Sequence, residues 1–103
     1  MNILRINVPD RNDSVSRVTL NEKQYLIRFT YNYYADRWSF SVYTLMQEPL
    51  AVNLRIVPDF PLNLHVSDRR FPAGFFAAYT DRQTIGRDDF VNGNAHFAFM
   101  SFG

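Results

Sequence analysis

One stretch decides the fold of this chain: YLIRFTYNYYADRWSFSVY, from Tyr25 to Tyr43. Apolar residues alternate with polar ones along both of its halves, and this period of two is typical of strands with one buried face. The stretch therefore predicts a hairpin with arms at residues 24–32 and 37–45. We expect its apolar face to form the structural core, which comprises Tyr25, Ile27, Phe29, Tyr31, Trp38, Phe40 and Val42.

A four-residue loop at 33–36 sets the register of this hairpin. The register pairs Tyr31 with Trp38 and Phe29 with Phe40, so that apolar side chains lie opposite apolar ones. A slip of one residue would place aromatic side chains opposite polar ones, so the pattern itself favours this pairing. An isolated hairpin is marginal in water, and we therefore expect further strands to cover it.

Several other segments show strand patterns between clusters of turn-forming residues. We predict strands at residues 3–8, 15–20 and 75–79, with short strands possible at 54–57 and 62–66. Between residues 47 and 61 three prolines loosen the pattern. Asn92-Gly93 is a strong signal for a two-residue hairpin turn, which would pair Phe90 with Ala95 and return through residues 95–102.

These segments predict an all-β architecture, because no amphipathic helix and no internal repeat is visible in the sequence. We expect either a small antiparallel β-barrel or a two-sheet β-sandwich built around the aromatic hairpin. The 103 residues suffice for one domain, and we predict a single β domain over residues 1–103. Closure into a barrel would hide the edges of such apolar strands.

The composition excludes several classes of function. Hydrophobic residues make up 47% of the chain and aromatic ones 17%, which is enough for a packed core. The net charge is +1, so no strong field would attract nucleic acid or a membrane surface. Cysteine is absent, which rules out disulfides and thiolate chemistry and fits a reducing cytoplasm. No segment has the pattern of a signal peptide or a membrane span.

The sequence contains no convincing catalytic or metal-binding motif. His65 and His96 lie 31 residues apart without a ligand spacing, so we interpret them as structural or surface residues. Asp88 and Asp89 would point to opposite faces of a strand. In the register of the Asn-Gly hairpin, Asp89 would face His96 as a cross-strand charge pair. We therefore expect no enzyme activity, no cofactor and no metal.

A stretch next to the most loop-like part of the second half has the composition of a binding hot spot. It combines cationic and aromatic side chains, which are enriched where protein interfaces derive most of their affinity. An equally strong alternative is that its phenylalanines fold back into the core. The candidate interface consists of Arg69, Arg70, Phe71, Phe75 and Phe76.

The hairpin also resembles a known family. Residues 29–43, FTYNYYADRWSFSVY, match the pattern Phe/Leu-x-Tyr-Asn, a short loop, and Trp-x-Phe/Leu-x-Leu/Val-Tyr. This pattern is similar to that of small baseplate plug proteins of contractile-tailed bacteriophages, of the kind described in cyanophages. The likeness continues through the proline-and-leucine segment at 57–62, the turn at 92–94 and the closing aromatic strand.

The resemblance implies a non-enzymatic structural component of a phage tail baseplate. Such a plug blocks the tail tube near the hub and spike and contacts hub, spike, tail tube or tape-measure proteins. It implies a cyclic homo-oligomer, with a trimer favoured because the site lies on a symmetry axis. The location implied is the virion, after assembly in the host cytoplasm, without stable binding to nucleic acid or a membrane.

Two other functions remain open from the sequence. An OB-like module could bind single-stranded nucleic acid or an oligosaccharide by stacking on Tyr31, Tyr33, Tyr34 and Trp38. The low net charge argues against it, since binding to a phosphate backbone needs a basic groove. A small enzyme is the other alternative, and the lack of catalytic motifs argues against that class.

Overall fold

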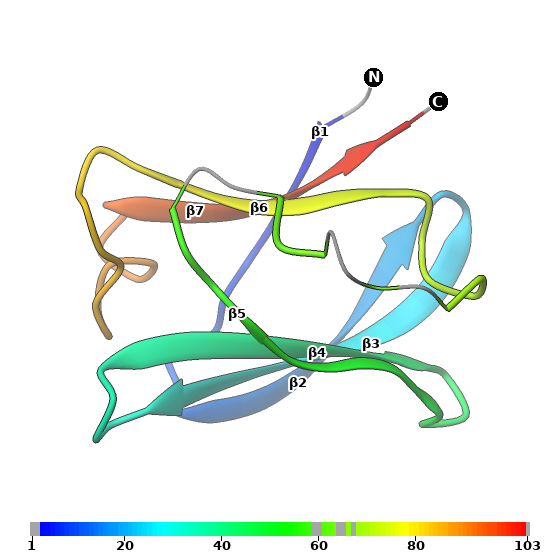
Figure 1. Ribbon diagram of the computed structural model, residues 1–103, viewed down its shortest axis with the longest axis horizontal. Coiled ribbons are helices and arrows are strands. Elements are labelled where there is room, and N and C mark those ends of the chain that lie inside the picture. The colour runs from blue at the N-terminus through cyan, green and yellow to red at the C-terminus, as the bar shows by residue number, and fades with distance from the viewer. Residues whose placement is uncertain (1–2, 59–60, 64–65, 67, 103) are drawn as a thin grey trace.

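Two antiparallel sheets face each other in the computed structural model, which describes residues 3–58, 61–63, 66 and 68–102 (Figure 1). The upper sheet in Figure 1 has three strands in the order β1-β7-β6, and the lower one has four in the order β2-β3-β4-β5. The strands found among the described residues are β1 (Ile3–Ile6), β2 (Asp13–Leu20), β3 (Lys23–Asn32), β4 (Arg37–Thr44), β5 (Pro49–Arg55), β6 (Gly74–Thr80) and β7 (Ala95–Ser101).

The predicted all-β fold is confirmed, and the sandwich is the form that it takes. Within the described part of the chain, no strand of one sheet pairs with a strand of the other, so the barrel is not closed. On one side the chain after β5 crosses to the upper sheet, where Pro58 forms an isolated parallel bridge with Ala78. The opposite side, between β1 and β2, has no such bridge among the described residues.

The predicted hairpin register is confirmed. Strands β3 and β4 pair Tyr31 with Trp38 and Phe29 with Phe40, around a loop at residues 33–36. The loop ends at Asp36, whose φ of 49° lies in the left-handed region that Asp tolerates better than most residues. The alternation of side chains was therefore sufficient to fix which residues lie opposite one another.

The apolar face of the hairpin lies in the core. The structure buries all of the seven residues proposed for this face except Tyr31, which is partly buried and packs against the others. The upper sheet supplies the covering layer through Phe97, whose ring centroid lies 5.1 Å from that of Phe29 and 5.0 Å from that of Phe40. Tilted and edge-on aromatic pairs of this kind contribute roughly 0.5–1.5 kcal/mol each beyond their burial.

Strand β5 was not predicted at its full length. The sequence suggested at most a short strand at 54–57, whereas the structure has Pro49–Arg55. The pairing of β5 with β4 shifts register, and Asn53 has a φ of 54°, so the strand is bulged and lacks a clean period of two. Pro49 is tolerated because it begins an edge strand, where its missing N–H is not needed.

The prediction of a short strand at 62–66 is wrong for the residues that can be compared. Leu62 and Asn63 form a turn, and Val66 lies outside the strands. Leu64 and His65 lie outside the described residues. The Asn63 side chain nevertheless joins the upper sheet, because its Oδ1 accepts a hydrogen bond of 2.8 Å from the Phe76 N–H.

The predicted Asn92-Gly93 hairpin is also wrong. The chain there turns in a helical manner, with the Asn92 N–H donating to the Asp88 carbonyl at 2.9 Å. Only Gly93 has a positive φ, of 78°, whereas a type I′ hairpin turn needs two such residues. Gly93 instead adopts the left-handed conformation that commonly ends a helical turn. Strand β7 consequently pairs with β6, and Ala95 lies opposite Thr80 rather than Phe90.

Candidate interface

The outer face of the three-stranded sheet is mostly apolar, and its polar side chains are Arg5 on β1 and His96 on β7. Register places Ile3, Met100 and Phe75 in one row across β1, β7 and β6. These side chains point away from the core, because their neighbours in the strands, Phe76 and Phe99, belong to the buried cluster. Ile3 leaves 66% of its surface exposed. A row of apolar side chains on an outer face is typical of a surface that contacts a partner.

The same face continues to both sides of this row. Ala77 and Ala98 pair at its centre, where both are buried, and the exposed Arg5 lies opposite Ala98 on β1. The Tyr79 hydroxyl donates a hydrogen bond of 3.0 Å to the sulfur of Met100. Phe75 meets the exposed Phe102 edge-on, with ring centroids 4.9 Å apart. We call this surface the apolar face, and it consists of Ile3, Phe75, Ala77, Tyr79, Ala98, Met100 and Phe102.

The outer face of the four-stranded sheet has a different composition. Its central feature is Arg28, whose guanidinium donates two hydrogen bonds to the Asp13 carboxylate, at 2.8 and 2.6 Å. Arg28 holds the pKa of Asp13 below its usual range, chiefly through these hydrogen bonds. Across the sheet, Thr30 lies opposite Ser39, and Arg28 lies opposite Ser41. This face has the charged and hydroxyl side chains expected of a solvated sheet surface.

The structure divides the interface proposed from the sequence into separate parts. Arg69 is exposed, and Arg70 is held by the Asp68 carboxylate at 3.0 Å and by Glu48 at 3.5 Å. The hydrogen bonds from Arg70 lower the pKa of Asp68. Phe71 is partly buried and packs edge-on against Phe76, with centroids 5.6 Å apart. The two arginines and Phe71 therefore form a loop anchored to the sandwich.

The two adjacent phenylalanines of β6 point to opposite layers. Phe75 belongs to the apolar face, whereas Phe76 is completely buried and contacts Phe40 and Phe97. The prediction that Phe76 belongs to an exposed interface is wrong, because neighbouring residues of a strand alternate between its faces. Phe76 is a core residue that joins the two sheets.

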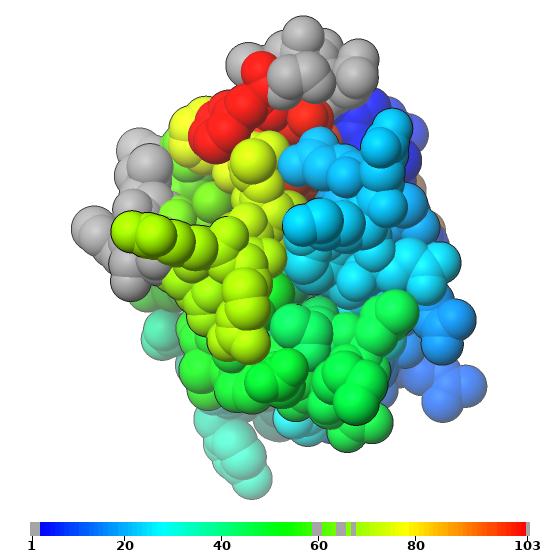
Figure 2. Space-filling view, turned by 90° about the vertical axis from the view of Figure 1, so that its right-hand side faces the viewer, coloured from blue at the N-terminus to red at the C-terminus, as the bar shows by residue number. Residues whose placement is uncertain are grey.

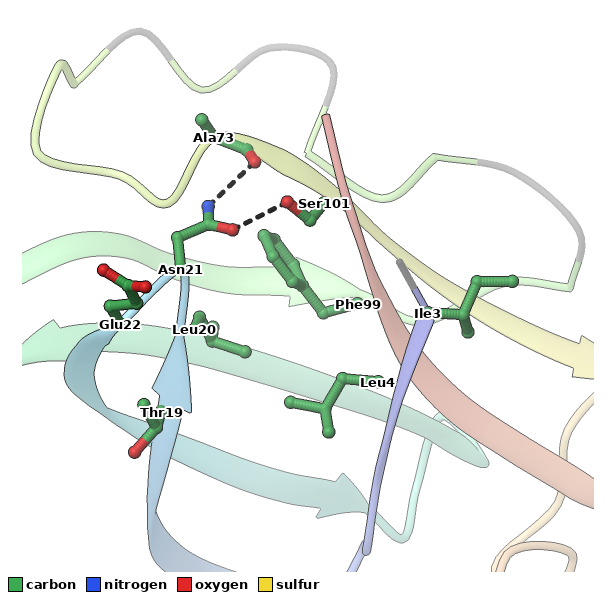
Figure 3. A pocket seen from close by; sticks show the side chains of 9 residues that line it. All are labelled: Ile3, Leu4, Thr19, Leu20, Asn21, Glu22, Ala73, Phe99 and Ser101. Carbon is green, nitrogen blue, oxygen red and sulfur yellow. Dashed lines mark hydrogen bonds between the residues drawn. The ribbon is translucent and has the colours of Figure 1, made fainter. Parts of the chain in front are cut away.

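The open side of the sandwich has a groove of about 650 Å³ between the ends of β1 and β2. Figure 2 faces this side, where the light-blue turn between β2 and β3 lies next to the yellow segment before β6 and the red end of β7. Figure 3 shows Leu4, Leu20 and Phe99 pointing toward one another inside it, while Ile3 points away. Asn21 spans its rim by donating to the Ala73 carbonyl at 3.0 Å and accepting from the Ser101 hydroxyl at 2.7 Å.

The residues considered for chemistry are not brought together. Asp89 does not face His96, which pairs with Tyr79. The buried Asp89 carboxylate instead accepts a hydrogen bond of 2.6 Å from the Gly86 N–H and lies 3.4 Å from Arg82. His65 lies outside the described residues. Within the part of the chain that the structure describes, no three acidic, His or Cys side chains are grouped as metal ligands would be.

The stacking platform considered for nucleic acid is not assembled either. Trp38 is only 1% exposed, and its indole N–H donates to the Gly86 carbonyl at 3.1 Å. Tyr31 packs against it with ring centroids 5.3 Å apart. A ring that is buried in this way offers no free face to a base. The described strands also form an open sandwich and not the closed barrel of an OB-fold.

A comparison with protein families identifies the kind of protein to which these surfaces belong. The family model described as cyanophage baseplate Pam3 plug gp18 matches residues 1–101. The chain belongs to this baseplate plug family. It is therefore a structural component of a phage tail baseplate in the virion, and it associates with other baseplate proteins. No curated protein matches the chain. The described residues include no helix that is long and apolar enough to cross a membrane.

Sequence analysis missed most of the apolar face, although a signal for it exists. Strands β6 and β7 read GFFAAYT and AHFAFMS, with apolar residues on both alternating sets of positions. A strand that is apolar on both sides indicates that both of its faces are covered in the assembled protein. Of the apolar face, only Phe75 was among the residues proposed from the sequence.

Proposed function

We propose that this chain blocks the tail tube at the baseplate, near the hub and spike, and that its apolar face is seated on a neighbouring tail protein. It acts through shape and contact, without catalysis. We further propose that it is a single domain over residues 1–103, assembled in the host cytoplasm as a cyclic homo-oligomer, with a trimer favoured by the symmetry of the tail axis. The candidate partners are the hub, spike, tail tube and tape-measure proteins.

The observation that supports this proposal most directly is the apolar face itself. Membership of the plug family gives a baseplate location, and a baseplate component must adhere to its neighbours. Ile3, Met100 and Phe75 form a continuous row across three strands, and such a row is costly to leave in water. Contact with a neighbouring protein removes this surface from water, which favours assembly.

Co-purification of the chain with each tail protein encoded by the same phage tests the proposal. Ile3→Glu introduces a charge into the apolar face and should weaken binding by about tenfold or more, because an unpaired carboxylate would be buried at the contact. Val15→Glu is the matched control: Val15 also lies on an edge strand facing outward, and it is 60% exposed against 66% for Ile3.

The two variants give distinct outcomes. Loss of binding in Ile3→Glu with retention in Val15→Glu supports the apolar face as the contact surface. Equal binding by both variants removes the apolar face from the proposal. A wild-type chain that binds no hub, spike, tube or tape-measure protein contradicts the plugging role, and sedimentation of the purified chain tests the cyclic oligomer independently.

A further inference from the structure

The loop between β3 and β4 carries two tyrosines whose rings contact one another and no other ring among the described residues. Tyr33 is 80% exposed and Tyr34 is 99% exposed, at the tip of the hairpin that organises the core. The turquoise loop projects below the rest of the molecule in Figure 2. It belongs to the four-stranded sheet, so it lies on a different layer from the apolar face. Loop tips are usually built from small or polar residues, and two large rings there are unusual.

The loop is held in one conformation by its own hydrogen bonds. The Asn32 Oδ1 accepts from the N–H groups of Tyr34 and Ala35, each at 3.1 Å. The Tyr31 hydroxyl donates to the Asp36 carboxylate, which fixes the other end of the loop. Because the tip is ordered before it meets a partner, little conformational entropy remains to be lost on binding.

The base of the loop is anchored to the core. Tyr31 packs on the buried Trp38, and the Arg87 guanidinium lies 5.3 Å from the Trp38 ring centroid. Arg87 is itself fixed by hydrogen bonds of 2.6 Å to the side chain of Asn12 and 2.9 Å to that of Asp10. The two exposed rings therefore stand on a rigid support that connects three separate segments of the chain.

The arrangement of the rings indicates the shape of the partner. Tyr33 and Tyr34 meet edge-on, with centroids 5.9 Å apart and an interplanar angle of 86°. Perpendicular rings form a wedge and not the flat platform on which bases or sugars stack. A wedge of two amphipathic rings fits a concave protein pocket with apolar walls and hydrogen-bond acceptors for the two hydroxyls.

The charge around the tip is mixed and does not form the basic groove that binding to nucleic acid needs. The loop contains Asp36, whose hydrogen bond is the main cause of the raised pKa of the Tyr31 hydroxyl. The exposed Asp88 also lies close enough to contribute to this shift. Two carboxylates next to the base of the loop would repel a phosphate backbone. Two arginines also lie at this base: Arg87 is paired with Asp10, and the exposed Arg37 lies opposite Asn32 and next to Asp36.

We propose that Tyr33 and Tyr34 are an anchor that inserts into an apolar pocket of a neighbouring baseplate protein, as a contact separate from the apolar face. This inference rests on the baseplate role proposed above and names a second point of attachment. With contacts on two layers, the chain bridges two neighbours and does not adhere to one alone.

The test compares the full-length chain with the double variant Tyr33→Ala/Tyr34→Ala. Binding is measured by biolayer interferometry against each purified baseplate protein of the same phage. We expect the double variant to bind at least one of these proteins with about 30-fold lower affinity, which is the loss typical of truncated hot-spot aromatic residues. Met46→Ala is the matched control, because Met46 is 81% exposed in the turn after β4, at the other end of the same hairpin arm. It should change affinity less than threefold.

Circular dichroism melts accompany each measurement, and the double variant should melt like the wild type because both rings lie in solvent. Unchanged binding by a folded double variant overturns the anchor, while loss of binding in Ile3→Glu still leaves the baseplate role standing. A wild type that binds no baseplate protein overturns both proposals. Tyrosine-dependent binding of oligo(dT), of a glycan or of a second copy of the chain also overturns the inference.

Discussion

The outer face of the three-stranded sheet and that of the four-stranded sheet differ, although both cover the same core. The first has Ile3, Met100 and Phe75 in a row, and the second has Arg28 paired with Asp13 among serines and threonines. Both sheets contribute inward-facing side chains to the same buried cluster. The two sheets differ in the side chains that their strands direct outward.

This contrast supports the proposal that one layer is complete in water and the other is completed by a partner. Strand β2 reads DSVSRVTL, in which exposed and partly covered residues alternate as expected for a solvated edge. Strand β7 reads AHFAFMS, and it directs His96, Ala98 and Met100 outward. The proposed contact with a neighbouring tail protein would account for apolar residues that the fold of the isolated chain does not require.

The largest effect is expected in the core on which both faces depend. Phe97→Ala removes a ring that contacts Phe29, Phe40 and Phe76 across the sandwich. We expect a loss of about 3–5 kcal/mol in the free energy of unfolding, which is a large part of the total for a small domain. Urea denaturation measures this loss. If only one of the two sheets lost protection from hydrogen exchange in Phe97→Ala, the sheets would not share a core, and the comparison of their outer faces would not hold.

A smaller loss of stability is expected from a substitution at Gly74, where β6 begins. An added Cβ at Gly74 would lie 2.5 Å from Cζ of Phe99 and would overlap the carbonyl oxygen of Met100. Gly74→Ala should therefore destabilise the chain by about 1–3 kcal/mol, since the backbone of β7 would have to move. Gly86→Ala is the control, because its Cβ would meet only the Asp89 carboxylate at an ordinary 3.5 Å. Equal thermal stability of the two variants would contradict the close approach.

The contrast between the faces can be measured directly with a dye that binds exposed apolar surface. Ile3→Glu/Met100→Glu should reduce the fluorescence of bound anilinonaphthalene sulfonate by about half or more, because it interrupts the row of the apolar face. Val15→Glu should change the signal less, since Val15 lies opposite Arg28 and has only Leu26 and Tyr43 as larger neighbours in the shallow hollow that it lines. A similar decrease in both variants would show that the two faces do not differ in the way we describe.

High pH should destabilise the hairpin formed by β3 and β4 in the four-stranded sheet. The hydrogen bond to Asp36, together with burial, raises the pKa of Tyr31 to about 12 from its usual value of 10.0. The folded state thus holds this proton more tightly, and the stabilisation is complete below pH 10 and is lost as the pH rises toward 12. Denaturation between pH 9 and 12 should show a steeper loss in the wild type than in Tyr31→Phe. Parallel curves would contradict this linkage.

The smallest effect is expected for the exposed ion pair of the four-stranded sheet. Arg28 lowers the pKa of Asp13, so the pair stabilises the fold above the usual carboxyl pKa, and this contribution disappears as the pH falls below it. Asp13→Asn should be almost as stable as the wild type at pH 7, because exposed pairs contribute little. The two proteins should converge as the pH falls through the lowered pKa of Asp13 and its carboxylate is protonated. A large difference at pH 7 would mean that this face is not an ordinary solvated surface.

The sequence by itself determined the elements in which the period of two is strict. The register of β3 and β4, the loop at 33–36 and the inward position of Phe29 and Phe40 all followed from local alternation, because a slip of one residue would reverse every side chain. The same local pattern, read together with the family resemblance, led to the baseplate plug family, which the match over residues 1–101 shows.

Only the tertiary structure decided the features that depend on distant partners. The Asn92-Gly93 signal gave way to a helical turn because the strand that Ala95 pairs with is β6, more than ten residues earlier in the chain. Strand β5 could be recognised only from its bulged pairing with β4 in the structure. The assignment of Phe75 to the surface and Phe76 to the core depended on which sheet face met the hairpin, and no local pattern contains that information.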